Sequence, residues 1–429
     1  MTEDNTSGSR RLFEKSSRRF PGGVNSPVRY FEPYPIFIKH ALGSKIWDVD
    51  GNQYTDFNMG FGPSILGHSD PDVLEHIRSR MDGGLIFGAP TEDEIELADL
   101  IAEADPSMEM MRFTNSGTEA TMHAIRLARG YTSRKVVVKM EGGFHGSHDY
   151  ALIKSGSGSL TFGIPSSAGV PEEAGRTVAV ASYNNLESVK KVFDRHGKDI
   201  ACVITEPVFG NTGVILPEAG FLEGLRDLCD RNGSLLIFDE VITGFRFGFS
   251  TYQRMIGVHA DLTVLGKIVG GGLPIGVFGG RSEIMRKVAP SGNVYVSGTF
   301  SGNPIAMSSG VATLRKLKKM DYRNLSEKLG LLLKNISGAF RENGVKAAVN
   351  GTGSMFQFFI GVEDVKNYED AMRADSRAYM NIFRSMIRDG EYLAPGQYET
   401  NFLSFAHSNR DLDGMVAKLK SNLAKIIPR

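Results

Sequence analysis

The chain has 429 residues, of which 41% are hydrophobic and 23% charged, as in ordinary soluble globular proteins. Lysine plus arginine and aspartate plus glutamate balance at 49 each, which excludes a strongly basic protein built to bind nucleic acid or an anionic membrane. No apolar run is long enough to span a bilayer, the polar N-terminus lacks the apolar segment of a secretion signal, and cysteines are few, so we expect a cytoplasmic protein.

The first predicted element is a β-hairpin over residues 45–57, with Asp50 and Gly51 at its turn. From about Thr91 to Val311, short apolar runs alternate with helical stretches, a pattern typical of an α/β domain with a mostly parallel sheet. Ligands of such sheets bind beyond the carboxyl ends of the strands. The runs expected to form strands are 110–113, 135–138, 177–180, 201–204, 235–238, 262–265 and 275–278.

The C-terminal part has a different pattern. A helix-rich stretch runs from about Ser308 to Glu342, and a strand-like run over 354–360, more helix and a final extended segment follow it. This order predicts a smaller α+β domain. The expected division is an N-terminal segment with the hairpin (1–60), a large α/β domain (61–315) and a small C-terminal domain (316–429).

Lys267 stands just beyond an expected buried strand and before three glycines and a proline. A lysine in a solvated turn is the common case, because charged side chains are rarely buried without a partner. A desolvated lysine, however, loses its proton readily and can form an imine with a carbonyl cofactor. Lys267 is therefore a candidate cofactor lysine, provided that other parts of a cofactor site lie at neighbouring strand ends.

Three further strand ends carry groups that suit a cofactor. Ser116, Gly117 and Thr118 open a helix whose N-terminus can hold a phosphate, although serine and threonine are also common as plain helix caps. Phe144 follows a second expected strand and can stack on a planar ring, with core packing as the alternative. Asp239 ends a third strand and can hold a protonated pyridine nitrogen, with a helix cap or a metal ligand as alternatives.

A metal site is not expected, because no cluster of histidine, cysteine and aspartate with ligand spacing accompanies Asp239. His145 and His148 form the one notable histidine pair, and we interpret them as part of a loop near the cofactor. Packing explains any one of the candidate groups. A phosphate cradle, an aromatic ring, a carboxylate and a lysine at successive strand ends of one sheet together predict a cofactor site.

The chain also carries specific motifs at Trp47–Gly51, Gly67-His68, Asn115–Glu119, Phe144–Gly146, Glu206-Pro207, Phe238–Arg246 and Lys267. Together they resemble the class III pyridoxal-phosphate-dependent aminotransferases almost from end to end. The resemblance implies a type I aminotransferase fold, a homodimer, and pyridoxal 5'-phosphate that alternates with its pyridoxamine form. It implies Lys267 as the catalytic Schiff-base lysine and Asp239 as the partner of the ring nitrogen. The further cofactor contacts that it implies are Ser116, Gly117, Thr118, Phe144, Asn211, Val241 and, from the other subunit, Thr299.

Four segments, 21–29, 156–171, 297–304 and 392–404, resemble the aminomutase branch of this family, whose members move an amino group within one substrate. The resemblance implies that Ser26 and Arg29 hold a substrate carboxylate. It also implies that Ser157 contacts the substrate from a mobile lid, and that Glu399 faces the substrate's amino group.

Two departures from the family pattern affect details of the expected site. Phe144 stands where tyrosine is usual, which keeps a stacking ring but removes a hydroxyl, and Phe61 replaces a frequent tryptophan. Two other functions stay open. An ω-aminotransferase would exchange amines with an external keto acid, but the C-terminal part offers no compelling arginine for a second carboxylate, and Glu399 would repel one. A catalytically silent binding protein on the same fold is disfavoured by the presence of both Lys267 and Asp239.

Overall fold

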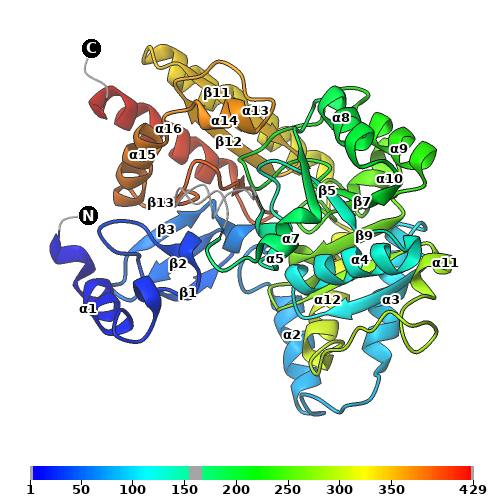
Figure 1. Ribbon diagram of the computed structural model, residues 1–429. Coiled ribbons are helices and arrows are strands. Elements are labelled where there is room, and N and C mark those ends of the chain that lie inside the picture. Colours follow the sequence, from blue (N-terminus) through cyan, green and yellow to red (C-terminus); the bar gives the residue numbers. More distant parts are fainter. Residues whose placement is uncertain (1–2, 154–166, 427–429) are drawn as a thin grey trace.

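The computed structural model describes residues 3–153 and 167–426 (Figure 1). Its largest sheet has seven strands in the order β4-β10-β9-β8-β7-β5-β6. β10 is antiparallel to both neighbours and the other pairs are parallel, so the predicted α/β domain with a mostly parallel sheet is confirmed. The strands are β4 (Met110–Thr114), β5 (Val136–Met140), β6 (Val178–Ala181), β7 (Ile200–Thr205), β8 (Leu235–Asp239), β9 (Leu262–Gly266) and β10 (Gly276–Gly280).

The central strands are mostly apolar because helices cover both faces of this sheet. Every residue of β5, β7 and β8 is buried. α4 (Gly117–Thr132) packs against one face through small and apolar side chains such as Ala124 and Leu127. α8 (Leu186–His196) and α9 (Phe221–Asn232) cover the other face (Figure 1). The helices cover the two faces of the sheet and leave the carboxyl ends of its strands accessible.

Two smaller sheets belong to the N-terminal and C-terminal parts of the chain. The first, β1-β2-β3-β13, contains the predicted hairpin as β2 and β3, and the second has the order β11-β12-β14. Their strands are β1 (Ile38–Leu42), β2 (Lys45–Asp48), β3 (Gln53–Asp56), β11 (Ala347–Thr352), β12 (Met355–Ile360), β13 (Glu391–Tyr392) and β14 (Asn401–Phe402). Ile46 and Phe57 share one hydrophobic core with Phe358 and Phe383, so the two ends of the chain pack together. The expected domain boundaries near residues 60 and 315 remain a prediction.

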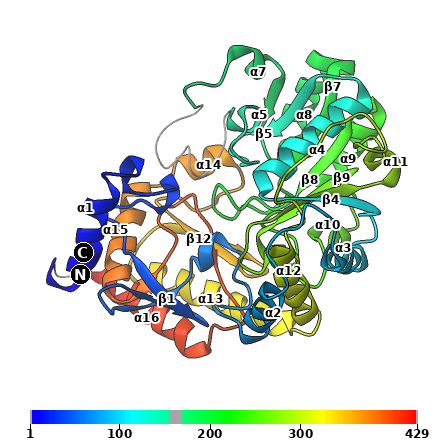
Figure 2. The same cartoon turned by 90° about the horizontal axis from the view of Figure 1, so that it is seen from below.

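The helices complete these layers. α12 packs against α2 and α3 (Figure 2). The helices not yet given are α1 (Ser7–Ser16), α2 (Pro71–Met81), α3 (Glu92–Ala104), α5 (Asp149–Leu152), α7 (Glu172–Arg176), α10 (Tyr252–Ile256), α11 (Ser282–Met285), α12 (Pro304–Leu317), α13 (Tyr322–Glu342), α14 (Tyr368–Met372), α15 (Ser376–Arg388) and α16 (Asn409–Ile426). None of the described helices is both long and apolar enough to cross a membrane.

The expected final extended segment holds only the short strands β13 and β14, and the chain then continues into α16, which was not predicted. The signal for this helix is present in the sequence. Leu412, Met415, Leu419 and Leu423 are all buried, and their spacing places them on one helical face.

His407 is a buried histidine that holds the C-terminal segment against β3. Its Nδ1 accepts a hydrogen bond from the Ser404 N–H at 3.0 Å, and its Nε2–H donates to the Asp56 carbonyl at 3.1 Å. Both contacts suit the neutral ring, and burial lowers the pKa of His407 to about 4. Between pH 6.5 and 4, His407 is protonated in the unfolded chain, where the histidine pKa is near 6.5, but stays neutral in the folded chain.

We therefore expect His407 to destabilise the fold as the pH falls from about 6.5 towards 4, by about 3 kcal/mol over that window. Above pH 6.5 the ring is neutral in both states and the effect vanishes. Urea unfolding of the wild type and of His407→Gln between pH 4 and 7 measures this difference, with the exposed His259→Gln as the control. Equal pH dependence in all three proteins would contradict the assignment.

Candidate active site

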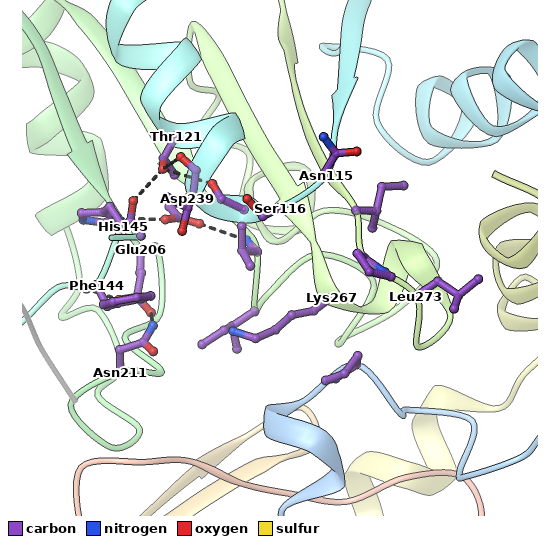
Figure 3. A pocket seen from close by; sticks show the side chains of 18 of the residues that line it. Asn115, Ser116, Thr121, Phe144, His145, Glu206, Asn211, Asp239, Lys267 and Leu273 are labelled. Carbon is purple, nitrogen blue, oxygen red and sulfur yellow. Dashed lines mark hydrogen bonds and ion pairs between the residues drawn. The ribbon is translucent and has the colours of Figure 1, made fainter. Parts of the chain in front are cut away.

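A cavity of about 440 Å³ lies at the carboxyl ends of the parallel strands. Its walls come from the residues that end or directly follow β4, β5, β7, β8 and β9 (Figure 3). The predicted residues that line it are Ser116, Gly117, Thr118, Phe144, Asn211, Asp239, Val241 and Lys267. The structure therefore brings together all the expected cofactor residues of one subunit, while their individual roles remain predictions.

The N-terminus of α4 forms the part of the cavity that suits an anion. Ser116 is the N-cap, and its hydroxyl accepts a hydrogen bond from the Glu119 N–H at 3.1 Å. The N–H groups of Gly117 and Thr118 belong to the first helical turn and have no carbonyl partner within the helix. A Cβ on Gly117 would lie 3.1 Å from Val241 Cγ2, so glycine lets the helix start pack closely on the β8 side. N–H groups without a helical partner and the helix dipole suit this end to an anion the size of a phosphate.

Asp239 ends β8 and is held by two donors. Its Oδ1 accepts from the Val241 N–H at 3.1 Å, and its Oδ2 pairs with His145 Nδ1 at 2.8 Å (Figure 3). Burial lowers the pKa of His145, an effect that the hydrogen bond to Asp239 opposes. A neutral imidazole that donates its Nδ1–H leaves the charge on the carboxylate. The pair therefore presents a fixed negative charge to the cavity.

Glu206 follows β7 and organises the wall next to Phe144. Its Oε1 accepts from the Phe144 N–H at 3.2 Å, and its Oε2 accepts from the Gly210 N–H and from Asn211 Nδ2, both at 2.9 Å. Burial and the neighbouring charge of Asp239 raise the pKa of Glu206. One buried carboxyl thus holds both the Phe144 backbone and the Asn211 amide at the cavity wall.

Lys267 is the first residue after β9 and has a positive φ of 44°. This left-handed conformation is uncommon for a residue with a side chain, and such residues cluster at functional sites. Burial lowers the pKa of Lys267, and the carboxylates of Glu206 and Asp239 oppose that effect. The buried guanidinium of Arg246 lowers it further. An amine with a lowered pKa is a better nucleophile and proton acceptor near neutral pH.

The predicted substrate residues that the structure describes do not line this cavity. Ser26 caps the 3-10 helix Pro27–Arg29, and Arg29 is exposed; neither lines the cavity. Glu399 is buried, its carbonyl accepts a hydrogen bond from Gln357, and its charge acts on Lys267. Ser157 falls outside the described residues.

Thr299 does not reach the cavity of its own chain, and it is exposed on the loop before α12. Its neighbour Phe300 is 59% exposed and Tyr295 is 71% exposed. Contiguous exposed apolar patches, unlike single scattered residues, mark surfaces that contact other molecules.

Sequence reasoning missed two residues of the site. Glu206 was noted only as part of a motif, although a carboxylate directly after a buried strand is the same signal that identified Asp239. His145 was interpreted as a loop residue, and its pairing with Asp239 was not predicted. Within the described ranges, no group of three or more histidine, cysteine, aspartate or glutamate side chains is placed to hold a metal ion.

Comparisons with known proteins give consistent results. The family model for class-III aminotransferases matches residues 28–384. The chain is 58% identical over 405 residues to glutamate-1-semialdehyde 2,1-aminomutase of Thermoplasma acidophilum, covering 94% of this chain and 96% of that protein.

Among solved structures, an ω-transaminase from Sphaerobacter thermophilus superposes with a TM-score of 0.90 at 32% identity, covering 97% of both chains. A transaminase with bound PLP superposes with a TM-score of 0.89 at 29% identity, covering 98% of both chains. The likeness in three dimensions therefore extends to transaminases that share about a third or less of this sequence.

Proposed function

This chain belongs to the class-III aminotransferases, and we propose that it converts glutamate-1-semialdehyde to 5-aminolevulinate, a tetrapyrrole precursor. The observation that carries the proposal is the 58% identity, over nearly the whole of both chains, to an aminomutase of that name. The segments that resemble the aminomutase branch in sequence support it, because they include the expected substrate residues Ser26, Arg29 and Glu399.

The cavity fits pyridoxal 5'-phosphate and its pyridoxamine form. Gly117 and Thr118 offer N–H groups for the phosphate, Phe144 offers a ring face, and Asp239 offers a carboxylate for the ring nitrogen. A solved relative with bound PLP supports this choice. When bound, the cofactor supplies a carbonyl that takes up an amine and a ring that withdraws electrons from the adjacent carbon.

The chain's own residues position the reactants and move protons. Lys267 Nζ, as a free amine, would move protons between the cofactor's reactive carbon and the two substrate carbons. Asp239 keeps the ring-binding end of the cavity negative, and His145 holds its carboxylate in place. Arg29 suits the substrate carboxylate because its guanidinium is planar and permanently charged. Ser26 and Ser157 are proposed as further substrate contacts, and Glu399 as the group that faces the substrate amine.

We further propose a homodimer in which Thr299 reaches the cofactor phosphate of the other subunit. The exposed position of Thr299, with the exposed rings of Tyr295 and Phe300 beside it, supports this arrangement. Cys202 and Cys229 are both free and buried, which supports a cytoplasmic location.

An ω-aminotransferase is the competing function, favoured by the high TM-score to an enzyme of that kind. The catalytically silent alternative is disfavoured by Lys267 and Asp239, which line the same cavity.

A direct test supplies the purified, cofactor-loaded protein either with glutamate-1-semialdehyde or with a β-amino acid and a keto acid. We expect 5-aminolevulinate, identified by mass spectrometry, in the first reaction and at least about 10²-fold lower amine transfer in the second, since the cavity would lack a second carboxylate anchor. Transfer to the keto acid without any 5-aminolevulinate would favour the ω-aminotransferase and reject the proposal.

A further inference from the structure

Lys139 is a buried charged residue in the middle of the main sheet, and the proposed reaction does not use it. It lies on β5, and the residue is 1% exposed. Burial lowers the pKa of Lys139 to about 7, while the carboxylates of Glu206 and Glu141 oppose that effect. A buried ammonium is costly unless all its protons are hydrogen-bonded.

Lys139 meets that requirement with three backbone carbonyls. Its Nζ donates to the carbonyl of Gly143 at 3.0 Å and to those of Ala151 and Ile153, both at 2.9 Å. All three acceptors lie on the segment that runs from the end of β5 to residue 153. One ammonium therefore joins the beginning and the end of this segment, which includes α5 and lies beside α7 (Figure 1).

The Gly143–Phe144 peptide group is held from both sides. Its carbonyl accepts from Lys139 Nζ at 3.0 Å, and its N–H donates to Glu206 Oε1 at 3.2 Å. An amino group and a carboxyl group thus each satisfy one polar end of the same peptide. A peptide plane that is fixed at both ends fixes the position of the Phe144 Cα, which carries the ring and leads directly into the His145 backbone.

We propose that Lys139 is a positioning residue that, together with Glu206, clamps the Gly143–Phe144 peptide and so holds the Phe144 ring and His145 in the cavity wall. The clamp is a property of the chain itself. Its effect on cofactor binding rests on the proposed function, because that function places the cofactor against Phe144.

The test uses Lys139→Met, which keeps a similar length but removes the donors. In the cofactor-free protein, we expect hydrogen exchange of amides in 143–153 to become at least about tenfold faster, with no comparable change in β7 and β8, because hydrogen bonds to a charged group are lost only there. We also expect pyridoxal 5'-phosphate to bind at least about tenfold more weakly, with a smaller visible circular dichroism per bound cofactor.

Lys316→Met is the matched control, because Lys316 also makes three charge-assisted contacts, to Asp70 and Asp72, at a surface away from this segment. It should change neither readout. Unchanged exchange in 143–153 for Lys139→Met, or an increase spread evenly over the sheet, would overturn the clamp.

Should Lys139→Met not fold, Lys139→Gln is measured instead. A smaller increase in hydrogen exchange is expected at the same amides, and no local increase there would also overturn the clamp. If the wild-type protein binds no cofactor but Lys139→Met still speeds hydrogen exchange at 143–153, the clamp stands and the proposed function is rejected.

Discussion

Lys267→Ala is expected to lower kcat for 5-aminolevulinate formation by at least about 10³-fold, because no other described amine is placed in the cavity wall to move protons at the substrate carbons. The variant should also fail to retain cofactor covalently after borohydride reduction. Steady-state kinetics and mass spectrometry of the peptide that contains residue 267 measure the two effects.

The exposed Lys190→Ala on α8 is the control for this substitution, and it should behave as wild type. Position 267 has a positive φ, so the substitution could disturb the fold as well as remove the amine. The far-ultraviolet circular dichroism of Lys267→Ala must therefore first match that of the wild type. A folded Lys267→Ala protein with undiminished turnover would contradict the catalytic role of this lysine.

Asp239→Asn is expected to lower kcat by about 10²- to 10³-fold. Both groups that contact the carboxylate are donors, the Val241 N–H and His145 Nδ1–H, so an amide would turn its NH2 group towards one of them. The substitution thus removes the negative charge that we propose for the ring nitrogen and also disturbs the orientation of the side chain. The measurement is kcat at saturating cofactor, with the bound cofactor quantified.

Asp194→Asn, at an exposed position of α8, controls for a change in net charge. If Asp239→Asn loses cofactor affinity but keeps the wild-type kcat when saturated, Asp239 only helps to bind the cofactor, and its proposed electronic role is wrong.

The main sheet and one half of the site could be predicted because their signals are local. A buried strand is a short apolar run, so a lysine or an aspartate that ends the run is visible in the sequence at Lys267 and Asp239. The first turn of α4 is equally local, because Ser116 and Gly117 follow such a run directly. These groups then converge because parallel strands share one carboxyl edge.

The pairings across the sheet could not be predicted in this way. His145 and Asp239 are 94 residues apart, and they meet because β7 alone separates β5 from β8 in the sheet. The contacts of Lys139 are hidden for a different reason. Its partners are backbone carbonyls, whose positions depend on how the segment after β5 folds back and not on which side chains it carries.

Whether the reaction takes place within one substrate is tested most directly by counting products per active site. The cofactor-loaded protein is mixed with excess glutamate-1-semialdehyde, with no keto acid and no other amine present. We predict continued turnover, with at least about ten molecules of 5-aminolevulinate formed per site, since an aminomutase regains its amine in every cycle. Formation that stops at or below one molecule per site and resumes only when a keto acid or an amine is added would contradict the aminomutase function.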